Sequence, residues 1–319
     1  MSCVRSWRPD SCPRGSMPSR IHLLWRSWPR PERASFEKNA DEGWRLSAPA
    51  GKLFLYMSTP PTMSSKSDHS QLQARIDSMG PWFYDIDLGN GLRTHSKVAA
   101  THDDIHVTRR EMVARAAQAH FGDRMGHIKA LDVGCHEGYF SFLLKELGVS
   151  EVHGADLRSD SLRKVEALAE IAGHASMRWT CCNCEELDRH IEGSHELCLC
   201  VGLLYHLENP IRCLRQIAAR CSEMMILETQ VCDEIEGQTE WGRQECRMPY
   251  QGGFALIDET CFDDNPETGA SPLALCPSPM ALKSILKALG FSTVEIIEPP
   301  QEGNEQMLRG KRVVMAAIR

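Results

Sequence analysis

Apolar runs and stretches of helical period alternate along the middle of the chain. Short apolar runs predict buried strands at 128–133, 151–155, 177–182, 196–201 and 223–229. Between them, apolar residues recur at helical spacing at 139–147, 159–171 and 210–220, with Ser159 or Asp160 as the candidate cap of the second helix. A crossover between parallel strands needs about a dozen residues, which a helix supplies. This order therefore predicts an α/β fold with a doubly wound, mostly parallel sheet.

The alternation stops after the fifth predicted strand. Residues 232–276 are rich in glycine and proline and predict a long irregular insertion over the carboxyl edge of the sheet. This insertion would be a substrate lid or, equally well, a solvated loop that folds back. A helix at 278–289 and strands at 292–297 and 311–318 follow. These strands would complete a sheet of seven strands, of which the last is antiparallel.

The residues before the sheet predict an N-terminal cap. A polar helix is expected at 64–80, a hairpin at 82–94 around Asn90-Gly91, and a second helix at 106–121. We therefore expect a disordered extension at 1–62, a cap at 63–125 and the sheet domain at 126–319. For the extension, the alternatives are an Arg-rich targeting or nucleic-acid arm, and a natural start at Met57 or Met63.

Composition excludes several classes of protein. The chain has 319 residues, 42% of them hydrophobic and 25% charged, and a net charge of −7, which is typical of a globular protein rather than a disordered or collagenous one. Residues 57–319 hold 26 basic and 38 acidic side chains, so the part predicted to fold has a net charge of −12. No apolar run approaches the roughly 18 residues that span a bilayer. We expect a cytoplasmic protein with no membrane partner.

The 14 cysteines are diluted along the chain and several lie in apolar runs, which predicts free thiols in a reducing compartment. A zinc site would use cysteines at ligand spacing. In the group from Cys181 to Cys200, only Cys181 and Cys184 have C-x-x-C spacing, while Cys198 and Cys200 share one face of a predicted buried strand. We therefore expect no metal site.

Candidate chemistry follows the first two strands, because ligands of open α/β sheets bind at the carboxyl ends of strands. Asp132, Gly134 and Gly138 follow the first strand, and Asp156 follows the second, where a carboxylate can accept both hydroxyls of a ribose. Dinucleotides and S-adenosylmethionine are both bound in this way. A dinucleotide site has G-x-G-x-x-G spacing, whereas this chain has G-x-x-x-G and an acid that would repel a pyrophosphate but attract an ammonium group. The pattern favours S-adenosylmethionine.

Four segments resemble successive motifs of the class I S-adenosylmethionine-dependent methyltransferases: LDVGCHEGYFSF, VHGADLR, CVGLLYHLENPIRCLRQIA and MILET. The resemblance covers 82–319. Within that superfamily, GLLYHLENP and the preceding WFYDIDLGNGLRT are similar to the group around the bacterial tRNA wobble-uridine enzyme. This resemblance implies a Rossmann-like methyltransferase sheet.

The resemblance also assigns roles to individual residues. It implies that the bend at Asp132, Gly134, Cys135 and Gly138 shapes the methionine side of the cofactor site. Asp156 would bind ribose, Leu157, Arg158, Cys184 and Glu185 would border the adenine, and Val201 would lie beside the reactive methyl.

The chain also departs from the family pattern in two ways. His136 replaces the second glycine of D-x-G-x-G-x-G, so either that position needs no positive φ or the turn is reshaped. The Lys-Gly-Pro-Phe element and the Trp-rich segment with which the wobble-uridine enzyme grips a carboxylated cofactor are missing before the first strand. Plain S-adenosylmethionine is therefore the expected cofactor.

Tyr205 and His206 follow the fourth strand and are the candidate catalytic pair, with His206 as a possible general base. A buried histidine bonded to backbone is an equally good interpretation of His206. The candidates for contact with the methyl acceptor are Trp82, Trp241, Arg247, Tyr250 and Arg312, the last by resemblance to a late basic residue of the wobble-uridine group.

We expect methyl transfer to an oxygen or nitrogen atom of a small molecule. One alternative is a tRNA wobble-uridine transferase, although the acidic net charge argues against it. Another is a module that binds the cofactor without turnover, and a less favoured one is an NAD-dependent dehydrogenase. The sequence does not indicate the oligomeric state.

Overall fold

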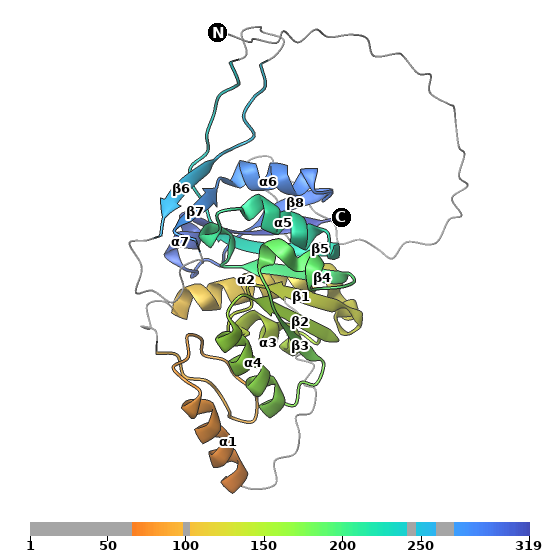
Figure 1. Cartoon of the computed structure of the whole chain (residues 1–319), viewed down its shortest axis with the longest axis vertical. Coiled ribbons are helices and arrows are strands. Elements are labelled where there is room, and N and C mark those ends of the chain that lie inside the picture. Colours follow the sequence, from red (N-terminus) through yellow and green to blue (C-terminus); the bar gives the residue numbers. More distant parts are fainter. Residues whose placement is uncertain (1–65, 98–102, 241–246, 260–270) are drawn as a thin grey trace, which may run out of the picture. The chain divides into compact units, whose positions relative to one another are not determined.

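The computed structural model describes residues 66–97, 103–240, 247–259 and 271–319 (Figure 1). Its main element is a seven-stranded sheet with the order β3-β2-β1-β4-β5-β9-β8. The strands are β1 (Lys129–Val133), β2 (Glu151–Asp156), β3 (Met177–Cys181), β4 (His195–Val201), β5 (Cys221–Gln230), β8 (Thr293–Ile297) and β9 (Arg312–Ile318). Neighbours among β1 to β5 pair in parallel, and β9 is antiparallel to both β5 and β8. The predicted α/β fold with seven strands and an antiparallel last strand is confirmed.

Helices cover both faces of this sheet, which explains why its central strands are apolar on both sides. In β4, Leu197, Leu199 and Val201 belong to one core cluster, and Cys198 and Cys200 belong to another. The first cluster holds side chains of α2, α3 and α4, and the second holds those of α5 and α6. The strand order reverses between β1 and β4, so their carboxyl ends open a crevice between the two winding directions.

Local sequence sets where the helices begin. The helices on the sheet are α2 (Asp103–Phe121), α3 (Tyr139–Glu146), α4 (Ser159–Ile171), α5 (Pro210–Ala218) and α6 (Pro279–Ala288), with the short α7 (Glu305–Leu308) before β9. Proline lies in the first turn of α5 and α6, where no intrahelical N–H is needed, and Ser278 caps α6 by accepting a bond from the Ala281 amide. The expected cap of α4 is wrong. Arg158 holds the N-cap position without a side-chain bond, and Ser159 is already helical.

The segment before the sheet contains α1 (Lys66–Ser78) and a turn, and then α2. Asn90 and Gly91 have φ of 53° and 77°, as the expected turn requires. The flanking residues form isolated bridges, between Asp87 and Arg93 and between Trp82 and Ser96, instead of two strands. One reason is that the Thr94 side chain replaces a backbone partner. Its hydroxyl accepts a hydrogen bond from the Ile86 amide and donates one to the Tyr84 carbonyl.

The insertion after β5 is more regular than we expected. Its described part contains β6 (Phe254–Asp258) and β7 (Leu273–Pro277), which form an antiparallel pair. We predicted an irregular loop because glycine and proline dominate 232–276, but two five-residue apolar segments still pair within it.

Residues 1–65 lie outside the described ranges, so the predicted extension is not tested. Across the described ranges, no helix is long and apolar enough to cross a membrane.

Candidate functional site

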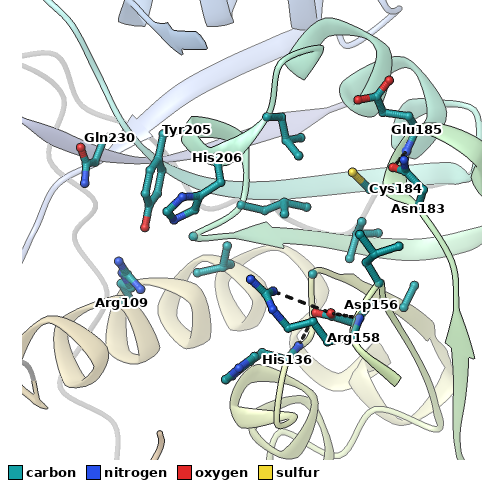
Figure 2. Close-up of a pocket in the computed structure, with 18 of the residues that line it drawn as sticks. Arg109, His136, Asp156, Arg158, Asn183, Cys184, Glu185, Tyr205, His206 and Gln230 are labelled. Carbon is teal, nitrogen blue, oxygen red and sulfur yellow. Dashed lines mark hydrogen bonds and ion pairs between the residues drawn. The ribbon is translucent and has the colours of Figure 1, made fainter. Parts of the chain in front are cut away.

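A cavity of about 1090 Å³ lies at the carboxyl ends of the central strands (Figure 2). Its walls come from the segments that follow β1, β2, β3 and β4, and from α2 and β9. Ten of the residues predicted to form the site line it: Gly134, Asp156, Leu157, Arg158, Cys184, Glu185, Val201, Tyr205, His206 and Arg312. The fold therefore brings together residues that are up to 178 positions apart between Gly134 and Arg312.

The bend after β1 keeps the backbone shape of a glycine-rich turn although one glycine is missing. Gly134 has a φ of 76°, and His136 has a φ of 49°, which few residues other than glycine adopt. The amide of Gly134 donates to the Ala155 carbonyl at 2.8 Å, and the amide of His136 donates to Asp156 Oδ2 at 2.8 Å. The turn is thus not reshaped, and His136 adopts the left-handed conformation of the glycine it replaces.

Asp132 lies behind this bend and does not line the cavity. It is 2% exposed, and Ser141 of α3 donates to its Oδ2 at 2.6 Å. Burial raises the pKa of Asp132 to about 7, although the Ser141 bond acts in the opposite direction. Cys135 and Gly138 also lie outside the cavity lining. Gly138 has a φ of 86°, and a Cβ there would come within 2.3 Å of Val165, so α3 and α4 pack closely at this point.

Asp156 ends β2 and presents its carboxylate to the cavity. It accepts from the His136 amide through Oδ2 and from the Arg158 amide through Oδ1, both at 2.8 Å. These bonds fix the carboxylate, and each oxygen retains a further lone pair for a ligand hydroxyl. Figure 2 shows Asp156 and Arg158 at one side of the cavity, with Asn183, Cys184 and Glu185 on another.

Asn183 begins the short helical turn η3 (Cys184–Arg189). Its Oδ1 accepts from the Glu185 amide at 3.0 Å, so the Asn183 side chain caps this turn. Cys182, Cys184 and Glu185 line the cavity beside it. This wall therefore combines two cysteines with the polar side chains of Asn183 and Glu185.

The opposite wall contains a buried group of charges. Glu228 of β5 is fully buried, and its carboxylate lies 3.2 Å from Arg109 Nε and 2.9 Å from Arg312 Nη1. Arg312 Nη2 also donates to the Tyr205 hydroxyl at 3.1 Å. Burial opposes the charge of Arg312, but the carboxylate of Glu228 and the hydroxyl group of Tyr205 more than compensate and raise its pKa. Two arginines share one carboxylate here, so this wall has a net positive charge.

His206 lies next to Tyr205 in the turn η4 (Leu204–His206), and their rings are 4.1 Å apart between centroids. Its Nδ1 is 2.6 Å from Oε1 of Glu259. Glu259 comes from the insertion and is buried. The ring thus contacts a carboxylate, and the role of His206 as a general base or as a structural histidine stays a prediction.

The remaining substrate candidates lie elsewhere. Trp82 is 4% exposed and donates through its indole N–H to the Ile76 carbonyl, in the core rather than in the cavity. Arg247 pairs with Glu240, and Tyr250 packs on Gly237, both away from the cavity lining. Trp241 is outside the described residues.

Sequence reasoning missed three charged residues that organise the site, namely Glu137, Glu228 and Arg109. Glu137 is 3% exposed and accepts from the amides of Phe83 and Tyr84 and from Lys164, which ties the N-terminal segment to the bend. Glu228 is the acid of the MILET segment, and an acid in an apolar strand needs a buried partner. That rule predicts a basic partner, but it does not identify Arg109 or Arg312.

Comparisons with known proteins agree with this geometry. Residues 130–223 match the family model of a methyltransferase domain. Two curated relatives are both called tRNA U34 carboxymethyltransferase. The one from Helicobacter pylori is 27% identical over 105 residues, which are 32% of this chain and 40% of that protein. The one from Campylobacter jejuni is 23% identical over 178 residues, which are 55% of this chain and 53% of that protein. The matched part thus spans 40% and 53% of the relatives' own lengths.

Solved structures extend the likeness of fold over more of the chain. The N-terminal domain of EvdMO1, crystallised in the presence of SAH and D-fucose, is 20% identical with a TM-score of 0.55. The matched region covers 79% of this chain and 97% of the EvdMO1 domain. The same domain with SAH bound has a TM-score of 0.54. Residues 130–223 are therefore similar to a methyltransferase domain, and the chain has the Rossmann-like α/β fold of solved methyltransferase structures.

Proposed function

We propose that this protein is an S-adenosylmethionine-dependent methyltransferase that modifies an oxygen or nitrogen atom of a small molecule. The observation that carries the proposal is the position of Asp156. Its fixed carboxylate lies in a cavity at the carboxyl end of β2, directly beside the bend after β1. This is where a ribose hydroxyl pair is bound in open α/β sheets.

The residues present fit such a cofactor. Asp156 supplies hydroxyl acceptors, and the wall at Asn183 and Cys184 supplies a shallow surface for an adenine. A Cβ on Gly134 would come within 3.0 Å of Leu203, so only glycine lets the bend approach that side chain closely. Asp132 is behind the bend and would act on a methionine group through the backbone rather than by contact.

The cofactor supplies a methyl group that is already activated for transfer. The protein then has to align the acceptor, exclude water and receive a proton where the acceptor carries one. Tyr205 and His206 lie beside Val201 at the end of β4 and are placed to do this, while the arginines at Glu228 set the charge of the acceptor side.

Isothermal titration calorimetry with S-adenosylmethionine and S-adenosylhomocysteine tests the cofactor assignment. We expect Asp156→Asn to weaken binding at least tenfold. The NH₂ group of the asparagine would face the His136 or Arg158 amide, which is itself a donor. The variant would also lose the charge-assisted hydrogen bonds to the ribose hydroxyls. Asp160→Asn is the matched control, since that side chain is 82% exposed on α4. Undiminished affinity in Asp156→Asn, or no binding to the wild type, would refute the assignment.

A second candidate function is a tRNA wobble-uridine transferase. The observation in its favour is the shared name of the two curated relatives, tRNA U34 carboxymethyltransferase. Release of S-adenosylhomocysteine over a panel of small hydroxyl and amine acceptors and of tRNA that lacks its modifications separates the two. Binding without turnover of any acceptor would instead support a module that only holds the cofactor.

We further propose a cytoplasmic location. Each described cysteine is a free thiol, as a reducing compartment would keep it. Fractionation of cells that express a tagged chain tests this proposal.

A further inference from the structure

The insertion after β5 brings one carboxylate into contact with the His206 ring. Glu259 follows β6, and its Oε1 lies 2.6 Å from His206 Nδ1, across 53 residues of sequence. The side chains of His206 and Glu259 are 19% and 8% exposed. A short contact between a ring nitrogen and a carboxylate with so little water access is a strong, charge-assisted interaction.

Backbone bonds hold this contact from both sides. The Glu259 amide donates to the Pro272 carbonyl at 2.7 Å, and the Leu275 amide of β7 donates to the Leu207 carbonyl at 2.9 Å, next to His206. The β6–β7 pair is thus fastened to the turn that carries the histidine. The backbone bonds of the β6–β7 pair therefore hold Glu259 in place beside His206.

The contact determines which ring nitrogen carries the proton. An ionised carboxylate only accepts hydrogen bonds, so Nδ1 must be the donor. In the neutral ring the lone pair then belongs to Nε2. Tyr205 and His206 both line the cavity, and Figure 2 shows their rings side by side over it.

We propose that Glu259 is a positioning residue that makes His206 the general base of the reaction. The inference rests on the proposed function and restricts its substrate class, because a base is needed only where the acceptor must lose a proton as it reacts. The acceptor is therefore a hydroxyl compound rather than an already nucleophilic amine.

The step is balanced without any further reactant. The acceptor oxygen forms a bond to the methyl carbon as the bond from that carbon to sulfur breaks, and the electron pair of the broken bond stays on sulfur. The hydroxyl proton passes to His206 Nε2. Glu259 then faces an imidazolium, whose charge it stabilises.

A test that needs no acceptor is nitrogen NMR of the histidine side chains in ¹⁵N-labelled full-length protein, with His206→Asn used to assign the signal. We expect the wild type to show a neutral His206 ring protonated at Nδ1. In Glu259→Gln the amide can both donate and accept, so the signal should change to a mixture of tautomers. Asp233→Asn is the matched control, because Asp233 starts the same insertion and pairs with Lys311 outside the cavity.

The second measurement is kinetic and uses the best hydroxyl acceptor of the panel. We expect Glu259→Gln and His206→Asn each to lower kcat about 10²-fold or more, with the double variant little worse than either. Affinity for S-adenosylhomocysteine in calorimetry should stay unchanged, which separates this inference from the cofactor assignment. Glu259→Asp, which keeps the charge, should recover part of the rate.

Three results would overturn the inference: a wild-type ring protonated at Nε2 alone, an unchanged tautomer in Glu259→Gln, or full turnover in that variant. If no acceptor reacts, the NMR result alone decides whether Glu259 positions the ring. If the wild type does not bind S-adenosylhomocysteine, the proposed function fails, whatever the tautomer.

Discussion

His136 adopts a backbone conformation that side chains other than glycine rarely accept. Its φ of 49° costs about 1 kcal/mol or more relative to glycine. Its ring packs edge-on against Phe83 and Tyr84, with centroids 5.6 Å and 5.7 Å apart. Such contacts each contribute about 1 kcal/mol, so the ring offsets the backbone cost while joining the bend to the N-terminal segment.

This balance predicts different outcomes for two substitutions at one position. His136→Ala and His136→Gly both lose the ring contacts, but only glycine also releases the backbone strain. We expect the glycine variant to be more stable than the alanine variant by about 1 kcal/mol in urea denaturation. Equal free energies of unfolding would show that the φ of residue 136 is not strained in solution.

The buried carboxyl of Asp132 predicts a pH dependence of stability. Its pKa rises from 3.8 to about 7 on folding because it loses water, so between these values the folded protein holds a proton that the unfolded chain releases. The contribution of Asp132 to stability is therefore fully present below pH 3.8 and is lost as the pH rises toward 7, by up to about 1.4 kcal/mol per pH unit.

Asp132→Asn removes this titration and keeps an oxygen that can accept from Ser141. We expect the variant to gain stability relative to the wild type when urea denaturation is repeated from about pH 5 to about pH 8. The difference between the two proteins isolates this carboxyl from other groups that titrate in the same range. Parallel profiles would mean that Asp132 stays ionised in the folded protein.

Among the elements, the junction between the N-terminal segment and the bend depends on Glu137. Its carboxylate accepts hydrogen bonds from the Phe83 amide at 2.8 Å, from the Tyr84 amide at 3.3 Å and from the Lys164 ammonium of α4 at 3.1 Å. One buried acid thus satisfies three donors from two separate parts of the chain. Removing it leaves polar groups in a site with little water.

We expect Glu137→Ala to lower the free energy of unfolding by about 3 kcal/mol, and Glu137→Gln by about half as much, because the amide oxygen still accepts one N–H. Hydrogen exchange of the Phe83 and Tyr84 amides should accelerate most. A loss below about 0.5 kcal/mol in the alanine variant would show that water replaces the carboxylate without cost.

The elements of the sheet were predictable because most of the strands are rich in apolar residues and are bounded by turn residues. β1 at Lys129–Val133 and β9 at Arg312–Ile318 lie within one residue of the predicted 128–133 and 311–318. β6 and β7 escaped prediction because each is five residues long in a stretch full of glycine and proline. Asp156 could be predicted as a site residue because ligands of open α/β sheets bind at the carboxyl ends of strands. Its contact with a ribose is still a prediction. The contact between His206 and Glu259 could not be predicted, since no periodicity links positions 53 apart.

At the scale of the whole molecule, charge bears on the choice of acceptor. Residues 57–319 have a net charge of −12, whereas contacts to nucleic acid phosphates need a basic surface. The positive wall formed by Arg109 and Arg312 is buried in the cavity and lies around a carboxylate. It is suited to one small acceptor rather than to a backbone of phosphates.

We therefore expect no measurable binding of unmodified tRNA at about physiological salt, and at most weak binding when salt is lowered. Fluorescence anisotropy with labelled tRNA over a salt series measures this. Tight binding whose logarithm falls steeply and linearly with the logarithm of salt concentration would reverse the choice and favour the wobble-uridine function.

The place of β9 in the sheet has a consequence for how the molecule assembles. β9 lies between β5 and β8, so β8 reaches the main sheet only through it. β1 to β5 can therefore join before the last two strands arrive together, and this early part already contains Asp156. Glu228 of β5 pairs with Arg109 of α2, and β9 adds Arg312 as its second counter-charge. The side of the cavity around Asp156 is therefore built by β1 to β5, whereas the wall at Glu228 is complete only when β9 is in place.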